Sequence, residues 1–425
     1  EGIRAIGENS EPPGFFFLFK ICYNIHMKDI NFIYLRSPVT SSETFQNSER
    51  EKFLKKLNKN GDFLFTENGE KIFFIETGGT EEKFKKIYLN FSEPFYLVAT
   101  DANNSLPASL EIATFLRNKG LKFRLIHGKP EEVREQLKSD KIEEICGNCR
   151  GFSKKSLLEN KRYGVIGKPS DWLIASDVNY DECVSKLGAT LVDISTEEFM
   201  SEISSAKEII DPVIFKPLLN KKVSKETLDG ALKIYSAIRH IILKYNLDGI
   251  TVRCFDLLNT VKNTSCLALA MLNKDGYIAT CEGDVPAMLS MAIVREVNKT
   301  SSFQANPSYL DIKNNELNIA HCTIPLDMLT SYKITTHFES GIGNAVKGEL
   351  KLSKAHIFKL HPNLHEYLYL DIDILENLHS TCLCRTQIRV KSSQEMASLL
   401  SYPFANHLII YYDNGEIDLK SILTK

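Results

Sequence analysis

Short apolar runs alternate with amphipathic stretches along the first third of the chain. Four runs have the length and composition of strands that are buried on both faces, and they are Ile30–Leu35, Lys71–Ile75, Phe95–Ala99 and Leu121–His127. A helix is predicted over Leu106–Asn118, because capping residue types precede it, Pro107 lies in its first turn and Gly120 follows its end. This β-α-β alternation predicts a parallel, doubly wound sheet.

A second alternating unit follows Ser153–Lys161, a polar, lysine-rich segment that is typical of a linker. An amphipathic helix is predicted over Lys225–Tyr245, where apolar residues recur at helical spacing and form one stripe. The other predicted elements of this unit are strands over Tyr163–Gly167, Ala189–Ile194, Gly249–Cys254 and Gly276–Cys281 and a helix over Asp284–Val297. The unit therefore reads as a second α/β sheet.

The pattern changes after about residue 300, where short strands separated by turns replace the helical patterns. The predicted strands are Leu317–Thr323, Tyr332–Phe338, Lys347–Leu352, Ala355–Leu360, Gln387–Val390 and Leu408–Tyr412. Many short strands with few helices are typical of an antiparallel barrel or sandwich. The chain is thus predicted to carry two α/β units followed by a C-terminal β domain.

Four segments follow from these patterns. Residues 1–26 are expected to be an upstream extension, because the chain opens with Glu1, acidic residues precede the short apolar block Gly14–Phe19, and Met27 opens a new segment. The N-terminal α/β domain is expected over residues 27–155, the second α/β domain over 156–300 and the C-terminal β domain over 301–425.

Composition narrows the functional classes. Of 425 residues, 43% are hydrophobic and 25% are charged, as in ordinary globular proteins. The net charge of −2 lacks the basic excess of a nucleic-acid binder. No apolar run reaches the ~20 residues of a membrane span. Ten scattered cysteines do not resemble a secreted disulfide framework, so we expect a cytoplasmic protein.

Two carboxylates follow the predicted strand Gly276–Cys281, at Glu282 and Asp284. In open α/β sheets ligands bind at the carboxyl ends of strands, and Asp256 follows the neighbouring strand at the same edge. Oxygen ligands at this spacing suit a divalent metal. Asp284 is equally well placed to cap the helix that follows, so for this residue capping and metal binding both stay open.

Three histidines lie in or beside apolar strands, at His321, His337 and His407. A single histidine in such a place is often a satisfied core residue, but several that face a carboxylate-bearing sheet edge can be ligands. Arg385, at the start of a predicted strand, either ends that strand in solvent or points into a cleft, where its guanidinium would bind the substrate.

Two other motifs carry weaker signals. Cys146-Gly147-Asn148-Cys149 has the spacing of a redox or half-zinc motif, but it lacks a second ligand pair, and an ordinary structural role is the alternative. The turn Gly78-Gly79-Thr80 after a strand can cradle a phosphate through its N–H groups or can be a plain turn between strand and helix.

The ordered set of late motifs resembles the L-fucose/L-arabinose isomerase family. The resemblance runs in order from about Met27 to Lys425. Four segments carry it in the second half of the chain, and they are Glu282-Gly283-Asp284, Ala320-His321, His337-Phe338-Glu339-Ser340-Gly341-Ile342-Gly343 and Ala405-Asn406-His407. Further stretches similar to relatives of L-fucose isomerase are residues 100–106 (TDANNSL), residues 167–176 with Trp172 at their centre, and Cys384-Arg385-Thr386-Gln387.

The resemblance implies two Rossmann-like domains, a C-terminal barrel and isomerisation of an aldose to a ketose through an enediol. It implies a divalent metal, most often Mn²⁺, a small sugar as substrate and a homo-oligomer. By position, Glu282, His407 and Asp256 match metal ligands, Asp284 lies in the same segment, and Asp256 and Glu282 are the carboxylates expected to move the proton. The substrate contacts are expected from His321, His337, Arg385 and Trp172.

The chain departs from that family at Ile324, where arabinose isomerases carry a glutamate, and His321 is expected to replace it in the ligand set. Two other functions therefore stay open. One is a non-catalytic carbohydrate-binding or regulatory protein on the same fold. The other is metal-dependent hydrolysis or aldol chemistry with the same ligands.

Overall fold

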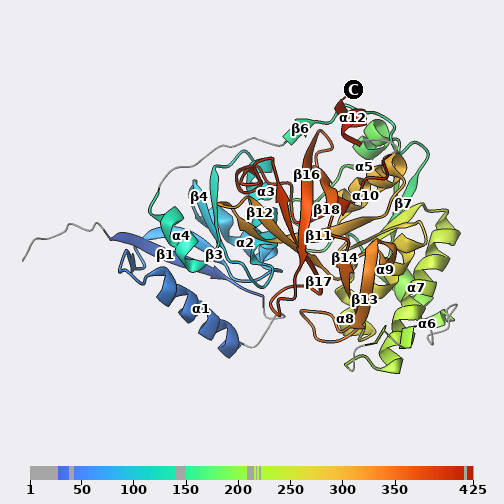
Figure 1. The fold of residues 1–425 in the computed structure, drawn as a ribbon, viewed down its shortest axis with the longest axis horizontal. Coiled ribbons are helices and arrows are strands. Elements are labelled where there is room, and N and C mark those ends of the chain that lie inside the picture. Colours follow the sequence, from blue (N-terminus) through green and yellow to red (C-terminus); the bar gives the residue numbers. More distant parts are fainter. Residues whose placement is uncertain are drawn as a thin grey trace, which may run out of the picture.

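The computed structural model describes residues 27–37, 43–139, 149–207, 215–216, 218–219, 222–415 and 419–424. The expected upstream extension 1–26 and Cys146 lie outside the described residues. Three sheets and one hairpin make up the fold (Figure 1). No helix in the described part of the chain has the length and apolar character needed to cross a membrane.

The first sheet is parallel and has the order β2-β1-β3-β4-β5. Its strands are β1 (Lys28–Leu35), β2 (Phe63–Phe65), β3 (Glu70–Ile75), β4 (Phe95–Ala99) and β5 (Phe123–His127). The accompanying helices are α1 (Glu43–Leu57), α2 (Glu81–Ile87), α3 (Ser105–Asn118) and α4 (Pro130–Leu137). The helix predicted over residues 106–118 is α3, and the predicted parallel sheet is confirmed.

The second sheet is also parallel and has the order β10-β9-β7-β8. Its strands are β7 (Arg162–Ile166), β8 (Thr190–Ile194), β9 (Gly249–Val252) and β10 (Ile278–Cys281). The longer helices of this unit are α6 (Thr196–Ser205), α7 (Lys225–Tyr245), α9 (Cys266–Lys274) and α10 (Val285–Asn298), and the short α5 (Tyr180–Glu182) and α8 (Asp256–Thr260) lie in connections. Helix α7 has the predicted bounds because Ser224 caps its start and Asn246, with positive φ, ends it.

The C-terminal sheet closes into a six-stranded antiparallel barrel, because its order β15-β18-β11-β12-β17-β16 is completed by pairing of β15 with β16. The strands are β11 (Ser302–Asp311), β12 (Glu316–His321), β15 (Lys354–Leu360), β16 (Glu366–Asn377), β17 (Thr386–Ser392) and β18 (Leu408–Tyr411). The hairpin of β13 (Leu329–Thr335) and β14 (Ala345–Leu350) stands beside the barrel. Of the two predicted forms, barrel and sandwich, the C-terminal β domain is a barrel. Closure of the barrel removes the exposed sheet edges.

One strand from earlier in the chain joins this sheet. Strand β6 (Cys149–Gly151) pairs with β16, and Cys149 itself is disulfide-bonded.

Two barrel strands were not predicted from the sequence. Strand β11 carries Pro307 beside a register shift and has polar residues on both faces, and β16 has charged residues among its apolar ones.

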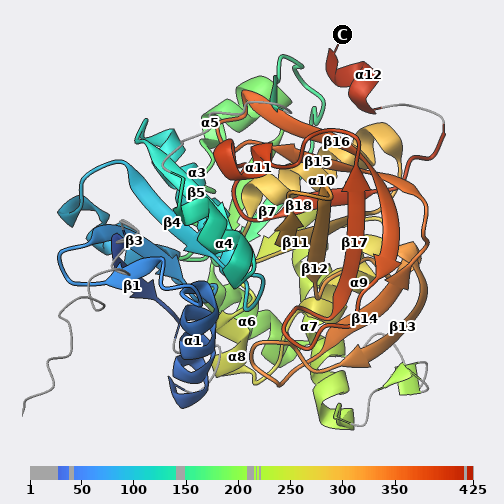
Figure 2. The same cartoon turned by 60° about the vertical axis from the view of Figure 1, so that its left-hand side comes forward.

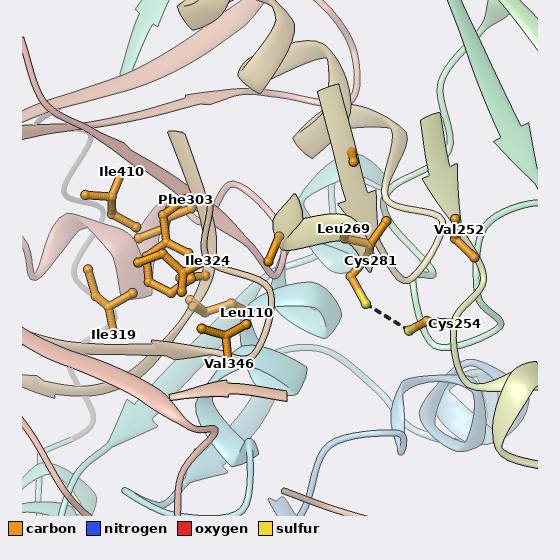
Figure 3. Packing of buried hydrophobic residues seen from close by; sticks show 14 of the residues in the cluster. Leu110, Val252, Cys254, Leu269, Cys281, Phe303, Ile319, Ile324, Val346 and Ile410 are labelled. Carbon is orange, nitrogen blue, oxygen red and sulfur yellow. Dashed lines mark hydrogen bonds between the residues drawn. The ribbon is translucent and has the colours of Figure 1, made fainter. Parts of the chain in front are cut away.

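Buried apolar side chains from all three sheets form one continuous core (Figure 3). Leu110 comes from α3, Val252 from β9, Leu269 from α9 and Phe303 from β11, and each is nearly inaccessible to solvent. Helix α10 packs on β10, β11, β15 and β18, so it lies between the second sheet and the barrel. The two views of Figures 1 and 2 show the barrel against both α/β units. This packing brings the carboxyl ends of β9 and β10 against the barrel.

Candidate metal centre

Glu282 lies in a tight turn between β10 and α10. Its φ is +66° and that of Gly283 is +71°. A Cβ on Gly283 would come within 2.5 Å of the Lys168 carbonyl oxygen, so the close approach of backbone requires glycine there. Asp284 ends the turn as the cap of α10, since its Oδ1 accepts a hydrogen bond from the Ala287 N–H at 2.7 Å. The turn holds the Glu282 side chain beyond the end of the strand.

The barrel brings two histidines to this carboxylate. His321 ends β12 and His407 precedes β18, and both strands pair with β11 between them. The Nε2 atom of His321 lies 3.8 Å from Glu282 Oε1, and the Nε2 atom of His407 lies 3.5 Å from the same oxygen. One ligand atom from each of the three residues lies within 4.8 Å of the other two, and all three residues are buried. Glu282, His321 and His407 therefore form a compact group that can hold a metal ion.

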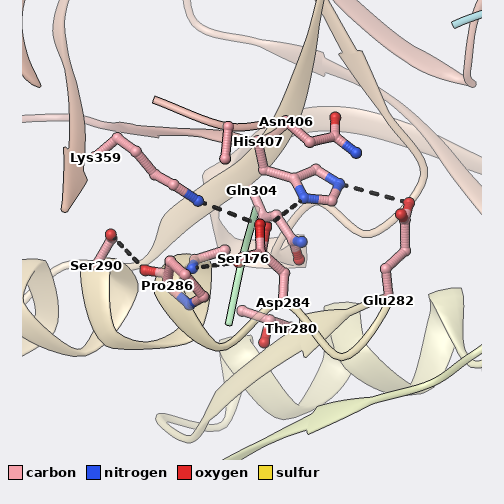
Figure 4. A network of polar contacts seen from close by, with 12 residues as sticks. Ser176, Thr280, Glu282, Asp284, Pro286, Ser290, Gln304, Lys359, Asn406 and His407 are labelled. Atoms are coloured by element: carbon pink, nitrogen blue, oxygen red, sulfur yellow. Dashed lines mark hydrogen bonds and ion pairs between the residues drawn. The ribbon is translucent and has the colours of Figure 1, made fainter. Parts of the chain in front are cut away.

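The outer ring nitrogens of both histidines are already engaged. His407 Nδ1 lies 2.7 Å from Asp284 Oδ2, and His321 Nδ1 lies 2.8 Å from Thr323 Oγ1. Figure 4 shows that the His407 ring points its other nitrogen toward Glu282. Carboxylates that hold the far nitrogen of an imidazole fix the tautomer and the ring orientation of a metal ligand.

One buried polar atom at this site makes no hydrogen bond with the residues that the structure describes. His407 Nε2 makes no hydrogen bond within the described part of the chain, although the residue is completely buried. Buried polar atoms without partners are rare and call for an explanation. A bound cation at this point would satisfy Nε2, and one carboxylate oxygen with two imidazole nitrogens is a donor set that suits divalent transition metals. The residues thus fit the metal that the family resemblance implies.

Charge within the group is strongly coupled. Burial works to lower the pKa of His407, but Glu282 and Asp284 outweigh it and raise that pKa to about 9. Burial works to raise the pKa of Glu282, but His407 and His321 hold it well below its ordinary value. The carboxylate is therefore ionised at neutral pH, as a metal ligand must be, whereas His407 is protonated in the metal-free protein and must release its proton when Nε2 binds a cation.

Trp172 contacts the other oxygen of Glu282. Its indole Nε1 donates to Oε2 at 2.7 Å, and its ring packs edge-on against Phe255 at a centroid distance of 4.9 Å. Trp172 was expected to contact the substrate. In the structure Trp172 and Glu282 both line one cavity, and Trp172 also holds the Glu282 carboxylate in place.

The two remaining expected carboxylate ligands lie outside the group of three. Asp284 contacts His407 on the side away from Glu282, and it serves as both helix cap and imidazole partner. Asp256 begins α8, where its carboxylate lies 3.1 Å from the Arg253 guanidinium. Arg253 in turn binds Asp171 with two nitrogens. The ends of β9 and β10 are adjacent as predicted, but the turn after β9 directs Asp256 to this arginine.

His337 and Arg385 lie together on the far side of the cavity wall. His337 is buried, with Nδ1 3.1 Å from Ser340 Oγ and its ring edge-on against Phe255. Arg385 donates to the carbonyl oxygens of Thr336 at 2.7 Å and His337 at 3.2 Å. Neither residue is among those that line the cavity beside Glu282, and Arg385 is partly exposed while it holds the backbone of this loop.

A cavity of about 280 Å³ opens in front of the metal group, where the first α/β unit meets the turn of Glu282. Its wall includes Trp172 and Glu282, which were predicted as site residues, and Glu81, Asn104 and Glu339, which were not. Gly78 and Gly79 also line it, so the glycine turn after β3 belongs to the site and carries Glu81 to it. The position of that turn at a strand end was the only signal for Glu81, whereas Glu339 lies in the segment of residues 337–343 that carries the family resemblance but was given no role.

Comparison with known proteins gives distant relatives. The chain is 22% identical over 332 residues to sulfoquinovose isomerases of Priestia aryabhattai and Priestia megaterium (strain ATCC 12872 / QMB1551), covering 73% of this chain and 71% of each relative. It is 24% identical over 233 residues to the sulfoquinovose isomerase of Clostridium sp. (strain MSTE9), covering 52% of this chain and 49% of that relative. No family model matches the sequence. The chain is a distant homologue of sugar isomerases, and the narrower L-fucose/L-arabinose assignment stays a prediction.

Proposed function

We propose that this protein is a metal-dependent sugar isomerase that interconverts an aldose and a ketose through an enediol. The observation that carries the proposal is the buried group of Glu282, His321 and His407, whose His407 Nε2 makes no hydrogen bond among the described residues, beside a cavity of about 280 Å³. The distant similarity to sulfoquinovose isomerases supports the same reaction class. The substrate is a small sugar, and Mn²⁺ is the proposed ion.

A divalent cation held by these three residues would supply positive charge to the sugar oxygens at which negative charge develops. The protein's own groups prepare the site for it. Trp172 holds one oxygen of Glu282, and Asp284 holds the His407 ring in one orientation. Burial of the group keeps bulk water away and strengthens each electrostatic interaction. A carboxyl within the cavity must then move the proton between adjacent sugar carbons.

Equilibrium metal binding and turnover test the proposal together. Wild-type protein is expected to bind one Mn²⁺ per chain and to form ketose from one member of an aldose panel that includes L-fucose, L-arabinose and sulfoquinovose. Glu282→Ala should lose both properties, whereas Glu349→Ala, an exposed change on β14, should lose neither. Equal metal affinity of wild type and Glu282→Ala would reject the site. Metal binding without any ketose formation would reject the isomerase and favour a carbohydrate-binding protein.

The family resemblance also implies a homo-oligomer, and we include that in the proposal. Light scattering at micromolar concentration is expected to give a multiple of the 48.2 kDa chain mass. A monomer that is fully active would reject this part of the proposal and leave the isomerase assignment intact.

A further inference from the structure

One carboxyl in the cavity has no role in the metal group. Glu339 lies in the loop of residues 336–344 between β13 and β14 and lines the same cavity as Glu282 and Trp172. Its Oε1 accepts a hydrogen bond of 2.6 Å from the side chain of Asn104, which immediately precedes α3 in the first α/β unit and does not use that side chain to cap the helix. A bond between segments 235 residues apart holds this carboxyl in one place at the cavity wall.

We propose that Glu339 is the catalytic residue that carries the proton between the two adjacent carbons of the sugar. This assignment rests on the proposed isomerase function. The carboxylate takes the proton from C2, and the electrons of the broken C–H bond form the C1–C2 double bond of the enediol. The former carbonyl oxygen O1 gains the proton that the O2 hydroxyl loses, and Glu339 then returns its proton to C1. No electrons are gained or lost, so no further reactant is needed.

The other carboxylates near the site are committed elsewhere. Glu282 has one oxygen facing the two histidines and the other bonded by Trp172. Asp256 is paired with Arg253 and does not line the cavity. Asp284 is completely buried behind His407. Of the remaining carboxyls that line the cavity, Glu82 is paired with Lys86 and Asp171 with Arg253, so Glu339 and Glu81 are left as candidates.

The charge environment separates these two. Burial raises the pKa of Glu339 to about 7, the nearby Glu282 charge adds to the rise, and the Asn104 donor opposes it. Burial also raises the pKa of Glu81 well above its ordinary value, and the groups that oppose the rise there are backbone donors, not a neighbouring side chain. A proton carrier works best when its pKa lies near the working pH, as the pKa of Glu339 does.

Other charged and titratable groups face the same region from neighbouring elements, and they are Glu81 and Glu82 of α2, Asp171, Glu282, Cys322 and His337. A cation bound at Glu282 would offset that carboxylate's charge. In the metal-loaded enzyme we therefore expect the pKa of Glu339 below about 7 and above its ordinary 4.5.

Glu339→Gln tests the assignment, because it keeps the shape and removes the proton-carrying group. It should lower kcat by roughly 10²-fold or more, abolish exchange of the substrate C2 hydrogen with solvent deuterium and leave Mn²⁺ affinity and the thermal midpoint near wild type. Glu349→Gln on β14 is the matched control. In metal-free protein, the infrared difference between wild type and Glu339→Gln should show a carboxyl that titrates near 7.

Asn104→Ala gives a second, directional test that does not depend on Glu339→Gln folding. This change removes the amide donor that lowers the Glu339 pKa. The rise of kcat with pH, which follows deprotonation of Glu339, should therefore move to higher pH. If wild type and Glu339→Gln turn over sugar equally well, the role of Glu339 is overturned and the isomerase function stands. The same holds if the Glu339 carboxyl titrates in the ordinary range of a glutamate. A wild-type protein that converts no aldose would overturn the proposed function and this assignment with it.

Discussion

The ammonium group of Lys359 lies 3.5 Å from Oδ2 of Asp284, the oxygen that also bonds His407, and both residues are completely buried. Figure 4 shows the resulting row of alternating charge, from Lys359 through Asp284 and His407 to Glu282. Burial works to raise the pKa of Asp284, but Lys359 and His407 outweigh it and keep the pKa below its ordinary value. Lys359 therefore keeps Asp284 ionised, as an imidazole partner must be.

Replacing Lys359 by methionine is expected to destabilise the fold by about 3–5 kcal/mol, because it leaves the Asp284 carboxylate buried without its cation. It should also weaken Mn²⁺ binding, since an unpaired Asp284 takes up a proton and no longer orients His407. Chemical denaturation and equilibrium metal binding check the two effects. Lys347→Met, on the exposed face of β14, should change neither, and a Lys359→Met protein as stable as wild type would refute the role of the pair.

The sequence predicted the strand-end carboxylate and the two histidines because short apolar runs mark where strands end. Glu282 and His407 could be singled out from these ends, and the two parallel sheets followed from the alternation of strands and helices. Lys359 could not be found in this way, since it alternates within an ordinary strand, and nothing local shows that its side chain turns inward to a buried carboxylate.

The sequence also could not predict where the side chains that follow a strand would point. Asp256 and Glu282 follow neighbouring strands, yet a helix begins at Asp256 and pairs it with Arg253, whereas the positive φ of Glu282 directs it to the barrel. Glu339 was quoted within a motif but given no role, because its partner, Asn104, belongs to another unit of the fold. Contacts between distant segments depend on how the units pack, and the periodicity of one segment carries no record of that.

Trp172 offers an optical test of the metal centre. It is the only tryptophan of the chain, and its indole N–H donates to Glu282. Adding Mn²⁺ to metal-free protein should therefore quench tryptophan fluorescence with a saturable, one-site dependence. Trp172→Phe should bind Mn²⁺ about 10- to 150-fold more weakly, because a hydrogen bond to a charged group contributes about 1.5–3 kcal/mol. Quenching that persists unchanged in Glu282→Ala would place the ion elsewhere.

Arg385 is expected to act through the loop that it holds. Its guanidinium donates to the carbonyls of Thr336 and His337, just before Glu339. Arg385→Lys keeps the charge but loses the fork, so we expect a loss of about 1–3 kcal/mol in stability together with reduced kcat. Thermal midpoints and initial rates on the same variant measure both. Arg389→Lys, on the exposed side of β17, is the control, and a variant with reduced sugar affinity but wild-type stability would instead indicate direct substrate contact.

His127 predicts how the fold responds to acid, independently of the metal centre. Its ring joins the first sheet to the barrel, because Nδ1 lies 3.2 Å from the Ala99 carbonyl oxygen and Nε2 accepts the Leu310 N–H at 3.0 Å. With one nitrogen donating and the other accepting, the ring fits only in its neutral form. Burial lowers the pKa of His127 from 6.5 to about 3, and the Ala99 carbonyl offsets this only in part.

The sign of the pH dependence follows from that shift. Between about 3 and 6.5 the unfolded chain binds a proton at this residue and the folded chain does not, so acid favours unfolding. The free energy of unfolding should fall by up to about 1.4 kcal/mol per pH unit on this account as the pH drops below 6.5. Urea denaturation across this range measures the slope. His127→Asn should flatten it, while His379→Asn, at an exposed histidine, should leave it unchanged. Parallel pH profiles for wild type and His127→Asn would show that the buried ring does not set the acid limit of the fold.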